Sequence, residues 1–139
     1  MKKSYSVVAD IAQIDEAFGD ESPFRLKSDA KNHDLCQEDL KKIAKELAEE
    51  IINGFDRKSC SAQYWAFNHQ INYAKIRVVD MERKKGKSNG YRCVVLCDMI
   101  ENEGYLLHIF NHNDKDNLSP TEKTKLKALV NQYVSQRYK

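Results

Sequence analysis

The chain lacks several features that would place it in a familiar class. No apolar run approaches the ~18 residues of a transmembrane helix. The stretch Met1–Asp10 carries the charge of a signal peptide, but its apolar segment is too short for one. The net charge is only +2, so any polyanion site must come from local clustering of cations. We therefore expect a cytoplasmic protein that does not associate with a membrane.

Cysteine is also scarce. The four cysteines, Cys36, Cys60, Cys93 and Cys97, are too few and too scattered for a disulfide scaffold. On a strand, Cys93 and Cys97 would lie roughly 13 Å apart, which is too far for the ligand shell of one metal ion. We interpret both as thiols of the hydrophobic core.

Recognisable catalytic motifs are missing as well. There is no glycine-rich phosphate loop, no nucleophile elbow, no H-E-x-x-H sequence and no close pair of acids suited to two-metal hydrolysis. The segment Asp114–Asn117 begins like a calcium loop but has no glycine at the position where such a loop turns. The sequence therefore predicts no metal and no cofactor.

The pattern of apolar residues predicts one α+β domain over residues 1–139. The length of 139 residues, with 41% hydrophobic and 32% charged residues, is ordinary for a single globular domain. Residues 35–55 predict a helix with Asp34 and Gln37 as a capping box and Gly54 as its stop. Its apolar stripe consists of Leu40, Ile43, Ala44, Leu47, Ile51 and Phe55. Residues 1–34 are expected to form an N-terminal extension of uncertain structure, strand or helix at 4–11 and irregular or partly helical afterwards.

The second half of the chain predicts a β-meander over 72–114 and a C-terminal helix over 119–136. The expected strands are 72–79, 91–99 and 105–114, the last two apolar on both faces and therefore central. Ser119, Pro120 and Glu122 have the spacing of a helix start with a capping box. The fold class is thus a small, curved, mainly antiparallel sheet flanked by helices.

Three cations on the meander are the first candidates for chemistry. In strand 72–79 the even positions are apolar, whereas Tyr73, Lys75 and Arg77 point to the other face, and Arg92 opens the next strand. If the strands pair, Lys75, Arg77 and Arg92 form one patch of phosphate size, where arginine binds in bidentate fashion. The alternative is that they are solvated strand charges or partners of acidic groups.

The connection between these strands is strongly basic. Arg83, Lys84, Lys85 and Lys87 supply four cations without an acid among them, which suits a nucleic-acid backbone. Lysines in such a turn also protect a sheet edge from aggregation. Before the meander, Tyr64, Trp65 and Phe67 lie close to basic residues and are either base-stacking or core aromatics.

Two histidines share the last strand. His108, between Leu107 and Ile109, is expected to be a satisfied core histidine, whereas His112 lies where polar residues begin. With an ordinary pKa near 6.5, a histidine trades protons at neutral pH, so His112 is the candidate acid–base residue.

These pieces occur in an order that resembles the RelE/HigB superfamily of bacterial toxins, and most of all its HigB-like branch. The strings are K-I-R-V at 75–78, a lysine- and glycine-rich loop, G-Y-R-C-V-V-L-C at 90–97, L-L-H-I-F at 106–110 and N-D-K-D-N-L-S-P-T-E-K-T-K-L-K-A-L-V at 113–130. The resemblance covers about residues 72–134. Where the HigB-like pattern often shows a tyrosine and then a basic residue, this chain has Phe110 and His112.

The resemblance implies a RelE-like fold and a growth-inhibiting mRNA interferase of a type II toxin–antitoxin system. Such an enzyme cleaves mRNA, usually on the ribosome and without a metal, and a cognate antitoxin neutralises it by covering the site. Lys75, Arg77, Arg92 and His112 would then be catalytic, while Arg83, Lys84, Lys85 and Lys87 would engage the RNA backbone. Tyr91 would stack on a base, because single-stranded RNA is splayed onto aromatic side chains in such sites. The alternative is a non-catalytic RNA-binding or protein-interaction module on the same scaffold.

Overall fold

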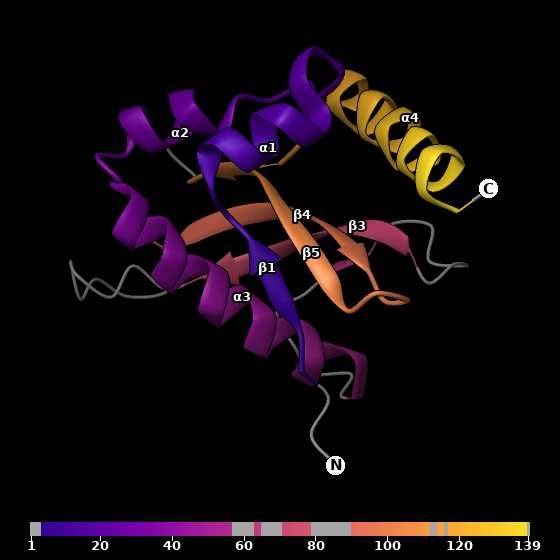
Figure 1. Ribbon diagram of the computed structural model, residues 1–139. Helices are drawn as coiled ribbons and strands as arrows, with labels where there is room; N and C mark the ends of the chain where they lie inside the picture. Colours follow the sequence, from indigo (N-terminus) through magenta and orange to yellow (C-terminus); the bar gives the residue numbers. More distant parts are fainter. Residues whose placement is uncertain are drawn as a thin grey trace.

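The described residues form a five-stranded mixed sheet at the centre of the protein (Figure 1). The computed structural model describes residues 4–56, 63–64, 71–78, 90–111, 114–115 and 117–138. The strands are β1 (Ser6–Val8), β2 (Gln63–Tyr64), β3 (Ile71–Val78), β4 (Tyr91–Asp98) and β5 (Glu103–Phe110). Their order is β1-β5-β4-β3-β2, with β1 parallel to β5 and the other neighbours antiparallel. The predicted α+β class and the β3–β4–β5 meander are confirmed, although β5 ends at Phe110 and not at residue 114.

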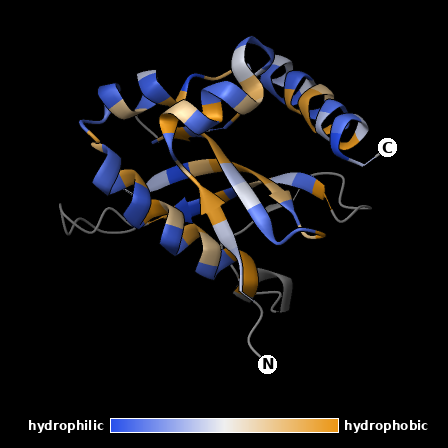
Figure 2. Ribbon diagram, viewed as in Figure 1, coloured by the Kyte–Doolittle hydropathy of each residue, from blue (hydrophilic) through white to orange (hydrophobic). Residues whose placement is uncertain are grey.

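Helices cover both faces of this sheet. The helix α3 (Gln37–Asp56) packs against β1 and β3, while α1 (Ile11–Phe18), α2 (Leu26–Asn32) and α4 (Pro120–Arg137) pack on the opposite face. A short 3₁₀ turn, η1 (Gly19–Glu21), follows α1. Figure 1 shows α3 and α4 on opposite sides of the sheet. The hydropathy colouring has apolar strands at the centre and helices that are polar on their outer sides (Figure 2), as expected for elements that bury one stripe each.

The N-terminal region is part of this core and not an extension from it. Residues 6–8 form β1, which pairs with β5, and α1 and α2 lie over the end of the sheet. The Phe18 ring meets the Tyr105 ring edge-on, with centroids 5.3 Å apart, and Leu26 is buried. β1 lies within residues 4–11, where a strand was one of the two predicted alternatives. The bounds of α1 and α2 were not predicted, because helices of eight and seven residues are too short to show a clear apolar period.

The start of α3 also differs from the predicted capping box. Asp34 adopts a left-handed backbone with φ of 52°, so the helix begins two residues later. The Cys36 backbone N–H donates to the Asp39 carboxylate at 2.9 Å. The Gln37 side chain instead donates to the Ala9 carbonyl at 3.1 Å, which ties α3 to the end of β1. The predicted box is therefore wrong, and α3 continues past Gly54 to Asp56.

The start of α4 matches the prediction. The Ser119 hydroxyl accepts from the Glu122 N–H at 3.1 Å, and the Glu122 carboxylate accepts from the Ser119 N–H at 2.8 Å. Leu126, Leu129 and Val130 are buried against the sheet. The cap and the apolar stripe together fix both the first residue of α4 and the side that faces β3.

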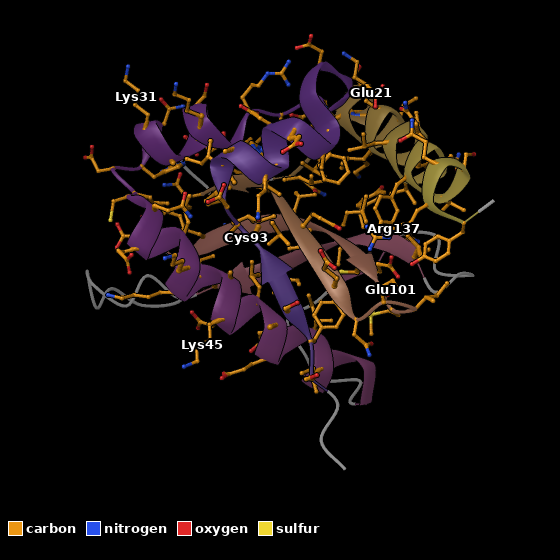
Figure 3. The ribbon with its side chains drawn as sticks, viewed as in Figure 1. Glu21, Lys31, Lys45, Cys93, Glu101 and Arg137 are labelled. Carbon is orange, nitrogen blue, oxygen red and sulfur yellow. The ribbon has the colours of Figure 1, made fainter. Side chains whose placement is uncertain are left out.

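The cysteines on β4 are core thiols, as predicted. Cys93 and Cys97 are free and buried, and Figure 3 shows Cys93 near the centre of the molecule. Burial raises the pKa of the Cys97 thiol to about 12 and raises that of Cys93 as well, so both stay protonated and unreactive at neutral pH. Among the helices of the described ranges, none is long and apolar enough to cross a membrane.

Candidate functional site

The structure brings three of the predicted site residues together on the α4 side of the sheet. Arg77 on β3 lies directly opposite Arg92 on β4, and Lys75 lies opposite Val94. Paired residues of antiparallel strands share a face, and residues two apart on one strand do so as well. Lys75, Arg77 and Arg92 therefore project from the same face, and we call them, with Lys123 of α4, the cation cluster.

The positive charges of the cation cluster repel one another. Like charges directly opposite each other on a sheet are destabilising, and Arg77 faces Arg92 in this way. Burial lowers the pKa of the Lys75 ammonium, and the nearby charges of Arg92, Lys123 and Arg77 lower it further. A phosphate placed among these groups would relieve the repulsion and accept charge-assisted hydrogen bonds from them.

The position of α4 determines which residues of the cation-cluster face are exposed to solvent. Tyr73 was expected to point outward, but it is buried under α4 at 1% exposure. Two residues further along β3 the cover ends, because Lys75 is half-buried and Arg77 is exposed. The Lys75 ammonium donates to the Asn117 side chain at 3.2 Å, just before α4 begins. The cluster is thus accessible at one end and flanked by α4 at the other.

A histidine–aspartate pair lies beside the cluster on the same face. His108 of β5 pairs with Val94, which in turn pairs with Lys75, so the three residues form one row across the sheet. The His108 Nδ1 is 2.7 Å from an Asp29 carboxylate oxygen, which also accepts from the Ile109 N–H at 3.2 Å. Since an aspartate carboxylate only accepts, we assign the proton to Nδ1.

His108 is held by its surroundings as well as by Asp29. Its ring stacks on Phe24 with centroids 3.9 Å apart and planes within 5°. The expected core position is confirmed, since His108 is 8% exposed. The expectation that its ring is fully satisfied is wrong, because its Nε2 is buried without a partner among the described residues. The sequence offered no signal for Asp29, because it is 79 positions away from His108.

Phe110 occupies the strand end where the resemblance calls for a tyrosine. It pairs with Arg92 across the sheet and is buried at 1% exposure. The Lys115 ammonium lies 5.0 Å from the Phe110 ring centroid, a cation–π contact, and 2.7 Å from the Glu122 carboxylate. Burial raises the pKa of Glu122, but the hydrogen bonds from Lys115 and from the Ser119 N–H outweigh it and lower the pKa overall. Phe110 is therefore a core residue beside Arg92 that carries no hydroxyl.

The structure contradicts the role predicted for Tyr91. It pairs with Val78 on the face opposite the cation cluster, and it is buried at 6% exposure with the His33 ring 5.4 Å away. The alternation that aims Arg92 at one face aims Tyr91 at the other, so Tyr91 cannot stack on a base bound by the cluster.

The remaining predicted residues lie outside the described part of the chain. These are His112 and the basic residues Arg83, Lys84, Lys85 and Lys87. The nearest described residue to His112 on its C-terminal side is Asp114, whose carboxylate lies 3.1 Å from the His33 Nε2.

Comparison with known proteins identifies no relative. No protein-family model, no curated protein and no solved structure matches this chain.

Proposed function

We propose that this protein binds the phosphodiester backbone of RNA at the cation cluster and cleaves it, as a metal-independent endoribonuclease of the RelE/HigB-like toxin class. The observation that carries the proposal is the opposed pair Arg77 and Arg92, with Lys75 on the same face. Its biological substrate would be mRNA, engaged on the ribosome, and an antitoxin that covers the cluster would be its natural inhibitor.

The chemistry that this cluster supports is transfer of the phosphoryl group to a neighbouring hydroxyl. RNA carries its own nucleophile, the 2′-hydroxyl, so the protein needs to turn it in line with the scissile bond and to stabilise the charge that develops. Arg77 and Arg92 would hold the phosphate oxygens. Lys75 supports the removal of the 2′-hydroxyl proton, since burial and the neighbouring cations lower the pKa of its ammonium and enlarge its neutral fraction. As the 2′-oxygen bonds to phosphorus, the P–O5′ bond breaks and a 2′,3′-cyclic phosphate forms. His112 is the other proposed proton carrier and would give a proton to the leaving 5′-oxygen.

One observation favours the second candidate function, which is RNA binding without cleavage. Phe110 is buried beside Arg92 and has no hydroxyl to donate a proton to the leaving group. The described histidine nearest to the cluster by strand register, His108, has its free nitrogen buried. A protein with these features and no other acid would hold RNA through the same cluster and release it intact.

Induced expression separates the two functions. If the chain is an endoribonuclease, we expect growth to stop and mRNA to acquire new 5′ ends within coding regions, mapped by primer extension. Arg92→Ala should abolish both effects at equal protein level, because it removes the central cation of the cluster. Unchanged growth together with salt-dependent binding of RNA by the purified protein would establish the binding module and exclude cleavage.

The dependence of cleavage on pH tests the role of Lys75. We expect the rate of RNA cleavage to rise as the pH increases from 6 towards 9, since the lowered pKa of Lys75 lets its neutral amine accumulate below the ordinary lysine value of 10.5. Lys75→Arg keeps the charge but does not deprotonate, so it should remove this rise and lower the rate about 100-fold. Lys125→Arg, on the exposed side of α4, is the matched control. An unchanged pH profile in Lys75→Arg would exclude Lys75 as the base.

A further inference from the structure

A groove runs along the outer side of β1, away from the cation cluster. It has a volume of about 470 Å³ and lies between residues 5–10 and α3. Its floor on the α3 side consists of Ala44 and Ala48, while Lys41 and Lys45 are exposed along its rim. Figure 3 shows Lys45 projecting outward from α3. The small floor residues leave space that longer side chains would fill.

Among the described residues, no further strand lies on the outer side of β1. β1 is the terminal strand of the sheet formed by the described residues. The Ser6 N–H donates to the Asn102 carbonyl at 3.2 Å, so the polar groups of Ser6 face β5. Because backbone groups alternate in direction along a strand, the N–H and C=O of Val7 point away from the sheet and toward the outer edge.

We propose that this groove receives an extended, acidic segment of a partner protein, which adds to the outer edge of β1 as a further strand. Pairing with the Val7 backbone supplies the ladder, and alternate side chains of the segment occupy the groove over Ala44 and Ala48. Carboxylates on the segment meet Lys41 and Lys45. Lys41 forms an exposed ion pair with Glu38 at 3.5 Å. Because exposed ion pairs contribute little stability, Lys41 can leave Glu38 and pair with a carboxylate of the bound segment.

The charges of the groove favour an acidic strand over other occupants. Of the residues that line it, only Asp10 is acidic, and its carboxylate accepts from the Gln13 N–H at 3.0 Å as the cap of α1. The outward-facing peptide groups of an edge strand match another peptide strand, which a nucleic acid does not supply. Since the groove borders α3 and the cation cluster lies on the α4 side, the segment and RNA can bind together, and this proposal does not depend on RNA cleavage.

An NMR titration of the full chain with a synthetic peptide tests the proposal. The probe is an acetylated octapeptide of alternating valine and glutamate. We expect it to shift the amide signals of residues 5–10 and of the facing turns of α3, and to slow hydrogen exchange of the Val7 N–H. The same peptide N-methylated at every residue has no N–H to donate to β1, so it should not bind. Saturating peptide without protection of Val7 would overturn the proposal.

Variants of α3 test the contribution of charge. Lys41→Glu with Lys45→Glu should weaken binding of the acidic peptide at least tenfold and should allow a valine–lysine peptide to bind. Lys42→Glu changes an exposed lysine of the same helix that does not line the groove, and it should leave binding unchanged. The proposal would be overturned if Lys42→Glu weakened peptide binding as much as the double variant does. It would also be overturned if an RNA oligonucleotide displaced the peptide from residues 5–10, because the groove would then bind negative charge and not specifically a peptide strand.

Discussion

Replacement of Arg92 by glutamine is expected to weaken binding of single-stranded RNA roughly 30-fold, which corresponds to about 2 kcal/mol for one charge-assisted contact. Arg92 lies centrally in the cluster, opposite Arg77 on β3 and beside Phe110 on β5. Glutamine keeps most of the length of the side chain but loses the charge and the bidentate donors. Fluorescence anisotropy with a labelled oligonucleotide, measured over a range of salt concentrations, would give both the affinity and its salt dependence.

Two further readouts make this prediction specific to a phosphate site. The slope of log affinity against log salt should fall in magnitude by about 0.7, the value for one phosphate contact on a single strand. The free energy of unfolding should not decrease, because removing Arg92 relieves its repulsion with Arg77. Lys125→Gln, which removes an exposed charge elsewhere, is the control. If it weakens binding as much as Arg92→Gln does, binding follows overall charge, and the cluster is not an RNA site.

Replacement of Asp98 by alanine is expected to lower the free energy of unfolding by about 3–4 kcal/mol. Asp98 is fully buried at the end of β4 and accepts four hydrogen bonds. The Tyr133 and Tyr138 hydroxyls donate to one carboxylate oxygen at 2.7 and 2.5 Å, and the Ile100 and Glu101 backbone N–H groups donate to the other at 2.9 and 3.0 Å. Without the carboxylate these four donors lose their acceptor, and α4 loses its attachment to the turn after β4. Urea denaturation would measure the loss.

Matched variants separate this attachment from general effects of substitution. Tyr138→Phe removes one of the four donors and should cost about 1 kcal/mol. Glu101→Ala changes an exposed side chain of the same turn but keeps its backbone N–H, so it should change stability by less than about 0.5 kcal/mol. A loss in Asp98→Ala no larger than in Tyr138→Phe would refute the central role of the carboxylate.

The same carboxylate predicts how stability depends on acid. Burial alone would raise the pKa of Asp98, but the hydrogen bonds from Tyr138, Glu101, Tyr133 and Ile100 together lower it below the ordinary value of 3.8. A group whose pKa is lower in the folded state stabilises fully above its unfolded pKa and loses that contribution as the pH falls through the folded value. Stability should therefore decrease below about pH 4, and Asp98→Asn should lack this part of the decrease.

Elements with strong local signals were predictable from the sequence. The Ser119 cap and the helical stripe of α4, the stripe of α3 and the β3–β4–β5 meander all follow from neighbours a few residues apart. The grouping of Lys75, Arg77 and Arg92 could also be predicted from the sequence, since alternation along a strand places Lys75 and Arg77 on one face. The same alternation, applied to Tyr91 and Arg92, would have shown that Tyr91 points away from the cluster.

Features that depend on distant partners were not predictable. Residues 4–34 form β1 and two short helices whose stability comes from packing on β5, not from their own propensity. The predicted capping box at Asp34 is wrong because the Gln37 side chain donates to the carbonyl of Ala9, which is distant in the sequence. Asp29 lies 79 residues from His108, and no local period connects them.

The sequence by itself therefore determined the helix and strand elements of the second half, the start of α4 and the faces on which the cations lie. These properties depend on backbone alternation, helical period and capping, which act over a few residues. Only the tertiary structure decided that Arg77 and Arg92 oppose each other, that Asp29 holds His108 and that Asp98 anchors α4. It also decided that β1 is the terminal strand among the described residues and lies beside a groove. Each of these depends on strand register or on packing between distant segments, where burial and pairing of the whole chain select the partner.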